Sequence, residues 1–277
     1  MTIKRKDFIK TLGLSGAALM INSSAMPAPV DPAADPSFEM GLASYTFRKF
    51  SLEDTIKAAK RLGLKRLAVK SMHLPLDSTP AQIKEASAKI KAAGLELYGA
   101  GVIYMKTEAE VNQAFDYAKH AGMETIIGVP NHELLGLVEK KVKEYNVKVA
   151  IHNHGPGDDL YSSVNDIHEK IKNLDKRIGI CMDIGHVVRI KEDPAALAIK
   201  YKDRLYDCHL KDEDKSETDG KPVEAGRGVI DLPAFLKAVI KINYAGTLAF
   251  EYEKDGDDPL PGLAESVGYI RGLLKMV

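Results

Sequence analysis

The chain of 277 residues has no excess charge of either sign, since 39 lysines and arginines balance 39 aspartates and glutamates. Beyond its N-terminal segment it has no basic run, which argues against a nucleic-acid partner and against binding to an anionic membrane surface. The apolar stretch at residues 12–21 is too short to span a bilayer. These absences leave a globular protein with a small-molecule partner as the expectation.

Cysteine is scarce, since the chain contains only Cys181 and Cys208. If each lies on a strand, Cys181 is in phase with Asp183 and points inward, whereas Cys208 is out of phase with His209 and points outward. We therefore expect no disulfide between them. No cysteine lies near residues 23–25, so the sequence does not indicate a lipoprotein membrane anchor.

The N-terminal segment differs in composition from the rest of the chain. Basic residues at 4–6, an apolar stretch at 12–21 and small residues at 23–25 have the layout of an export signal. The run KRKDFIK resembles a twin-arginine signal with Lys4 in place of the first arginine, and the Sec pathway is the alternative route. Four prolines within 26–37 indicate a linker. We predict an export signal and linker at 1–37 and a periplasmic or exported protein, with an amphipathic N-terminal helix as the alternative.

Strand-like and helix-like segments alternate eight times between residues 38 and 277. The expected strands cover 40–45, 64–70, 95–102, 125–129, 148–152, 178–186, 205–209 and 247–251. The expected helices cover 51–62, 80–93, 107–121, 133–145, 163–174, 194–201, 232–242 and 261–276. This alternation predicts an α/β fold with a parallel sheet, and eight strands favour closure into a (β/α)8 TIM barrel. The alternative, an open doubly wound sheet, would need a glycine-rich loop after the first strand, where the chain has none.

Histidines and carboxylates gather where the predicted strands end. Six of the eight histidines follow strands, namely His73, His132, His152, His154, His186 and His209. Asp183 lies at the end of the sixth strand segment and Glu251 at the end of the eighth. Because the carboxyl ends of barrel strands converge on one face, we expect these side chains to share a pocket. Histidine and carboxylate ligands suit divalent zinc, manganese, iron or cobalt.

Four motifs, in this order and spacing, resemble the xylose isomerase-like superfamily of sugar isomerases and epimerases. They are CMDIGH at 181–186, CHLKD at 208–212, EAGRGVIDL at 224–232 and LAFEYE at 248–253. The resemblance covers about residues 38–277. Members of this superfamily are metal-dependent TIM barrels, and they include endonuclease IV and enzymes of inositol catabolism.

The resemblance implies particular roles for the motif residues. Asp183, His209 and Glu251 match the family's metal ligands, and His186 matches a usual substrate contact. Arg227 lies in the glycine-basic-glycine turn that the family has before its seventh helix, and we predict it as a substrate contact. The implied cofactor is one divalent metal ion, with manganese, cobalt, zinc, magnesium and iron all open.

One family position is not matched. The fifth strand of the family carries a glutamate that binds the metal and takes part in proton transfer, but Ala150 stands at that position here. The inward-facing donors nearest to it are His152 and His154. We predict His152 as the replacement ligand, with His154 as the alternative or as a substrate contact.

The resemblance implies a sugar isomerase or epimerase that removes a proton alpha to the carbonyl of a keto-sugar. Glu251 is the expected base, and Lys211 is a second candidate because a nearby cation would lower its pKa. A salt bridge from Lys211 to Asp212 or Asp214 is the alternative for that residue. Loss of the family glutamate also makes a lyase that eliminates from a 3-keto-glycoside a serious alternative.

Other residues and functions complete the expectations. Tyr45 and His73 are predicted substrate contacts, and the rings of Tyr45, Phe47 and Tyr104 supply either stacking faces or packing. A non-catalytic sugar-binding barrel would require loss of the metal ligands, and a nuclease would require a three-metal cluster and a basic face. The expected partner is a small carbohydrate, and the oligomeric state stays open, a homo-oligomer included.

Overall fold

A computed structural model describes residues 36–277, so the predicted export signal and nearly all of the predicted linker lie outside the described residues. Within the described part, no helix is both long enough and apolar enough to cross a membrane.

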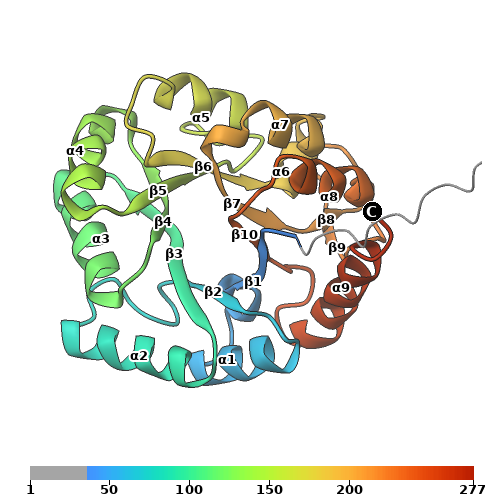
Figure 1. Cartoon of the computed structure of the whole chain (residues 1–277), viewed down its shortest axis with the longest axis horizontal. Coiled ribbons are helices and arrows are strands. Elements are labelled where there is room, and N and C mark those ends of the chain that lie inside the picture. The colour runs from blue at the N-terminus through green and yellow to red at the C-terminus, as the bar shows by residue number, and fades with distance from the viewer. Residues whose placement is uncertain (1–35) are drawn as a thin grey trace, which may run out of the picture. The chain divides into compact units, whose positions relative to one another are not determined.

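Eight parallel strands close into a barrel in the order β1-β10-β7-β6-β5-β4-β3-β2 (Figure 1). They are β1 (Glu39–Ala43), β2 (Arg66–Val69), β3 (Glu96–Met105), β4 (Thr125–Pro130), β5 (Lys148–His152), β6 (Ile178–Asp183), β7 (Leu205–Leu210) and β10 (Thr247–Phe250). A ring of helices surrounds the barrel, as Figure 1 shows. The predicted (β/α)8 TIM barrel is therefore confirmed.

The helices follow the strands in the predicted alternation. They are α1 (Leu52–Arg61), α2 (Pro80–Ala92), α3 (Glu108–Ala121), α4 (Leu135–Tyr145), α5 (Val164–Ile171), α6 (Ile184–Arg189), α7 (Pro194–Lys200), α8 (Leu232–Lys241) and α9 (Pro259–Leu273). Short side chains fix several of their first turns. Thr79 and Thr107 each form a reciprocal capping box with the side chain three residues further on. Gly122 ends α3 in the left-handed conformation, which glycine adopts at little cost.

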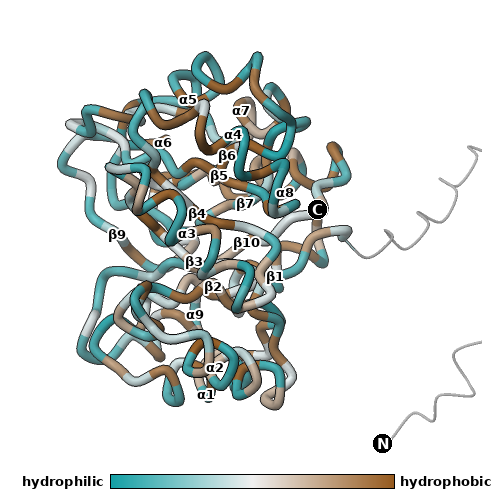
Figure 2. The backbone as a smooth tube through the Cα atoms, turned by 90° about the vertical axis from the view of Figure 1, so that its left-hand side faces the viewer, coloured by the Kyte–Doolittle hydropathy of each residue, from teal (hydrophilic) through white to brown (hydrophobic). Residues whose placement is uncertain are grey.

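The barrel has an inner and an outer apolar layer. A small cluster of buried side chains fills the inside, namely Ala68, Tyr98, Ile127, Ala150 and Cys181. A much larger set of aliphatic side chains packs between the strands and the helices, and Cys208 belongs to it. Figure 2 shows the corresponding apolar segments at the centre of the barrel and polar segments on the peripheral loops. Cys181 and Cys208 are free and lie on opposite sides of the sheet, as strand phase predicts.

Three local features differ from the predicted elements. The strand β6 stops at Asp183, and α6 begins at the next residue because the Asp183 side chain accepts a hydrogen bond from the His186 backbone N–H. The strand β3 continues to Met105. The loop after β7 contains a small antiparallel hairpin of β8 (Asp212–Glu213) and β9 (Pro222–Val223).

Candidate metal centre

Four side chains from four strand ends converge inside the mouth of the barrel. His152 ends β5, Asp183 ends β6, His209 lies on β7 and Glu251 directly follows β10. One ligand atom from each lies within 4.8 Å of all the others, and all four residues are buried. The structure therefore brings together the four residues that were predicted as metal ligands.

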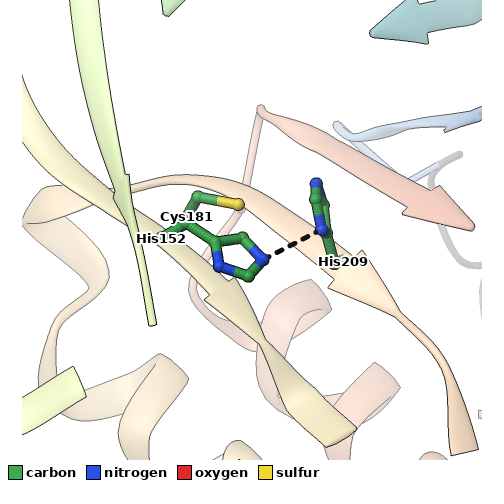
Figure 3. A group of neighbouring side chains, drawn as sticks. All are labelled: His152, Cys181 and His209. Carbon is green, nitrogen blue, oxygen red and sulfur yellow. Dashed lines mark hydrogen bonds between the residues drawn. The ribbon is translucent and has the colours of Figure 1, made fainter. Parts of the chain in front are cut away.

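Within this cluster, the imidazole nitrogens and carboxylate oxygens that could bind a metal lie close to one another. His152 Nε2 lies 3.2 Å from His209 Nδ1, and Figure 3 draws this contact as a dashed line. His209 Nδ1 lies 3.1 Å from Glu251 Oε2, and His152 Nε2 lies 3.5 Å from Asp183 Oδ2. Two imidazoles and two carboxylates form a donor set that suits a divalent transition metal.

The electrostatics of the cluster also fit a cation. Burial opposes ionisation of Asp183 and Glu251, yet neighbouring cationic groups hold the pKa of each carboxyl below its ordinary value. Burial lowers the pKa of His152 to about 3, which keeps its ring neutral and able to ligate. The residues present therefore fit a divalent ion held by His152, Asp183, His209 and Glu251.

Lys211 contributes the ammonium group of the cluster. Its Nζ lies 2.8 Å from Asp183 Oδ2 and 2.8 Å from Glu251 Oε2, and it also contacts Glu253. Burial works against the ammonium, but these three carboxylates raise the pKa of Lys211 well above its ordinary value. The alternative salt bridge to Asp212 or Asp214 is therefore wrong, since the ammonium pairs with other carboxylates. A lower pKa of Lys211 beside a bound cation stays a prediction.

A polar network inside the barrel supports His209 from below. Asp207 Oδ1 accepts a hydrogen bond from Tyr98 Oη at 3.1 Å, and Asp207 Oδ2 accepts one from Cys181 Sγ at 3.4 Å. The same Oδ2 lies 3.7 Å from His209 Nε2. Burial raises the pKa of Asp207. This network leaves His209 Nδ1 as the nitrogen that faces the other three donors.

Two further histidines, His154 and His186, lie next to His152. His154 Nε2 pairs with Tyr104 Oη at 3.0 Å, and the two rings stack with centroids 5.5 Å apart. His154 Nδ1 lies 3.6 Å from Asp158, so both ring nitrogens face away from the cluster. This geometry favours His152 over His154 as the fourth ligand. Burial lowers the pKa of His186, whose Nε2 lies 3.8 Å from Asp183 Oδ2, to about 4.

Tyr45 lies on the opposite side of the mouth, after β1. The Lys70 ammonium sits over its ring at 4.9 Å from the centroid. Burial lowers the pKa of Lys70, while the charges of Glu251 and Glu253 oppose that change, which places this lysine near the cluster. Tyr45 thus lies next to Lys70, and its substrate contact stays a prediction, whereas Phe47 packs in the apolar core.

Two predicted substrate contacts lie elsewhere. His73 is buried, and its ring nitrogens face Ser44 Oγ, Thr55 Oγ1 and the Phe47 carbonyl. His73 was grouped with the other histidines because it also follows a strand in the sequence. In the structure it links the segment after β2 to the segment after β1. Arg227 is exposed and forms a two-point ion pair with Glu265. These partners give no support to the substrate contacts predicted through His73 and Arg227, which stay predictions.

The glycine-arginine-glycine turn has a structural task instead. Both carboxylate oxygens of Asp212 accept backbone N–H groups of this turn, from Gly226, Gly228 and Ile230. Asp212 also accepts the N–H of Glu213. The turn thereby fixes β8 next to the cluster.

Two residues of the site were not predicted from the sequence. Glu213 had no recognisable signal. Asp207 was noted only for its in-phase spacing with His209, and its position below that histidine was not predicted.

The comparisons with known proteins agree with this fold. The family model for xylose isomerase-like TIM barrels matches residues 45–273, and the chain belongs to that family.

Two curated relatives match parts of the chain at 25% and 22% identity. The rhizopine catabolism protein MocC of Rhizobium meliloti is 25% identical over 149 residues, which cover 47% of this chain and 44% of MocC. The chain therefore matches less than half the length of that relative. An inosose dehydratase of Lacticaseibacillus casei is 22% identical over 60% of this chain and 70% of its own length.

Two solved structures share the fold at 14% and 15% identity. The IolI protein with a bound zinc atom matches with a TM-score of 0.72 and 14% identity, over 86% of this chain and 99% of its own. The 3-keto-D-glucoside 4-epimerase YcjR of E. coli matches with a TM-score of 0.68 and 15% identity, over 85% of this chain and 99% of its own.

Proposed function

We propose that this protein is a metal-dependent enzyme that isomerises or epimerises a keto-sugar by moving a proton at the carbon next to the carbonyl. The observation that carries the proposal is the cluster of His152, Asp183, His209 and Glu251 at the strand ends of a xylose isomerase-like barrel. The zinc in IolI and the sugar substrate in the name of YcjR support it.

The residues of the chain divide the task between them. A bound divalent ion would polarise the substrate carbonyl and acidify the neighbouring C–H group. Glu251 is ionised and takes the proton, because His209 and Lys211 hold its pKa low against the effect of burial. Lys211 keeps Glu251 in position through their 2.8 Å contact. His186, which is partly exposed near Asp183, donates to or accepts from a substrate oxygen.

A lyase is the second candidate, and one observation favours it. Ala150 occupies the strand position of the family's other proton-transfer glutamate, and its side chain is fully buried among apolar neighbours. With one base, removal of the proton is followed by loss of a beta substituent rather than by return of the proton. The dehydratase among the relatives belongs to this reaction type by its name.

One experiment tests both candidates. Metal analysis of the purified protein is expected to find about one divalent ion per chain. The loaded protein is then incubated with keto-sugars and 3-keto-glycosides in deuterated water. Solvent deuterium in the recovered sugar indicates proton transfer, and a released aglycone identifies the lyase. A protein that binds no metal and exchanges no proton would contradict both proposals.

We also propose that the chain is exported. The basic, apolar and small-residue segments before residue 26 support this. Fractionation of cells that express the full chain, with mass measurement of the recovered N-terminus, tests it. An intact N-terminus in the cytoplasmic fraction would contradict the proposal.

A further inference from the structure

The hairpin strand β8 presents a carboxylate that the mechanism above does not use. Glu213 is only 3% exposed, which is comparable to Glu251 at 6% and Lys211 at 5%. Its Oε2 atom is buried and has no hydrogen-bond partner among the described residues. A carboxyl oxygen in that state normally has a partner in a folded protein, so the position calls for a functional explanation.

The surroundings place Glu213 beside the metal cluster. Gly185, in the CMDIGH motif, has no side chain, and a Cβ atom built there would lie 2.7 Å from Glu213 Oε1 and 2.6 Å from Lys211 Cδ. The absence of a side chain at Gly185 therefore lets Glu213 and Lys211 approach the backbone that follows Asp183. The charges of Lys211, Asp183, Arg189 and Glu253 all act on this carboxyl.

The backbone of Glu213 is held on both sides. Its N–H donates to Asp212 Oδ1 at 3.0 Å, and its carbonyl accepts the N–H of Val229 at 2.9 Å. A rigidly held, unpartnered carboxyl next to a reaction centre is typical of a proton-transfer group. Burial also raises the pKa of Glu213 to about 7, so the acid and the carboxylate forms are both available near neutral pH.

We propose that Glu213 is the second proton-transfer residue of this site and takes the part of the family glutamate that is missing at position 150. The proposal rests on the proposed function. In the barrel order β10-β7-β6, Glu251 follows β10, whereas Glu213 lies against Gly185, which follows β6. In the proposed arrangement, Glu251 acts from the β10 side of β7 and Glu213 from the β6 side.

The proton steps balance in this arrangement. Glu251 takes the proton from the carbon next to the carbonyl, so that the C–H bond breaks and its electron pair stays on the substrate as an enolate. Glu213, in its acid form, gives its proton to that carbon from the other side, and a new C–H bond forms. Exchange with solvent then removes the proton from Glu251 and restores the one on Glu213 before the next turnover.

The variant Glu213→Gln tests the proposal on the full, metal-loaded chain, with methyl 3-keto-glucoside as the probe in deuterated water. Product formation is expected to fall on the order of 100-fold, while deuterium exchange through Glu251 stays within about threefold of the parent rate. Metal affinity, measured by calorimetry, is expected to stay unchanged. The matched control is Glu192→Gln, which alters another carboxyl with an unpartnered buried oxygen, in the loop between α6 and α7.

A second readout does not depend on the substrate. Infrared difference spectra of the parent protein are expected to show a carboxyl that titrates near pH 7, and this signal is expected to vanish in Glu213→Gln but not in Glu192→Gln. Absence of the signal in the parent, or equal product formation by parent and Glu213→Gln, overturns the assignment of Glu213. A parent protein that exchanges no proton with any keto-sugar overturns the proposed function instead.

Discussion

His152 and His154 lie two residues apart on the same strand end, yet their rings face different partners. His152 Nε2 points at His209 and Asp183, whereas His154 pairs with Tyr104 and Asp158. We expect His152→Ala to weaken zinc binding on the order of 100-fold, since it removes one of four ligands. Calorimetric titration of the metal-free protein measures this.

The matched variant is His154→Ala, which is expected to change zinc affinity less than about threefold because its ring nitrogens face other partners. The opposite ranking of the two variants would assign the fourth ligand to His154 and contradict the geometry of the cluster.

Asp207 is expected to act on the metal centre through His209. Its Oδ2 lies 3.7 Å from His209 Nε2, which is beyond hydrogen-bond distance, but its charge favours the tautomer with a proton on Nε2 and a free lone pair on Nδ1. We expect Asp207→Asn to lower zinc affinity about tenfold. Nitrogen-15 NMR of the histidine rings is expected to show a changed tautomer for His209 in this variant.

The control for this prediction is Cys208→Ala, a change at the next residue that faces the outer layer. Its His209 resonances and zinc affinity are expected to match those of the parent. A normal His209 tautomer in Asp207→Asn, despite weaker zinc binding, would show that Asp207 acts through packing alone.

The turn that holds β8 acts as a unit. Asp212 accepts backbone N–H groups from Gly226 and Gly228, and a Cβ atom at Gly228 would lie 2.2 Å from the Glu213 carbonyl oxygen. Since the contacted atoms belong to a fixed backbone, we expect Gly228→Ala to lower the free energy of unfolding by about 2 kcal/mol. Urea denaturation followed by circular dichroism measures it.

Arg227, between these glycines, provides the matched control. Its ion pair with Glu265 is solvent-exposed, and such pairs add little to stability. Arg227→Ala is therefore expected to leave both the free energy of unfolding and the KM for a keto-sugar nearly unchanged. A large increase in KM would contradict this expectation and would support a substrate contact through Arg227.

The barrel itself could be predicted because strand-like and helix-like segments have different periodicities and alternate eight times between residues 38 and 277. The metal cluster could be predicted because strand phase and the convergence of strand ends place His152, Asp183, His209 and Glu251 together. The helix α6 was missed because its apolar sequence, IGHVVR, continues the pattern of the preceding strand. It forms only because Asp183 caps it, which depends on geometry that no periodicity reveals.

Residues whose roles depend on loop conformation could not be predicted in the same way. Glu213 reaches the cluster only because Asp212 closes the turn at 226–230. Lys211 was placed correctly by strand phase, but its ion pairs with carboxylates were not predicted. Three carboxylates surround it, and one of them, Glu253, lies beyond the strand end at which the pattern stops.

The folded molecule as a whole resists protonation of its buried histidines. The pKa values of His152 and His186 in the fold, about 3 and about 4, lie below the ordinary value of 6.5. Burial also lowers the pKa values of His73 and His154. Below about pH 6.5 the unfolded chain binds protons at these rings that the folded chain does not, so stability falls as the pH falls.

Three groups act in the opposite direction. The pKa of His209 is raised because neighbouring carboxylates outweigh burial, and burial raises the pKa values of Asp207 and Glu213. All three therefore add stability at low pH that is lost as the pH rises. The four histidines act against them, and so do Asp183 and Glu251, whose pKa values are lowered. We therefore expect the melting temperature of the metal-free protein to fall between pH 6.5 and pH 4. His186→Gln is expected to remove on the order of 2 kcal/mol of this pH dependence, since its ring no longer takes up a proton on unfolding. Thermal unfolding of chelator-treated parent and variant across this range measures the difference, and parallel curves for the two proteins would contradict it.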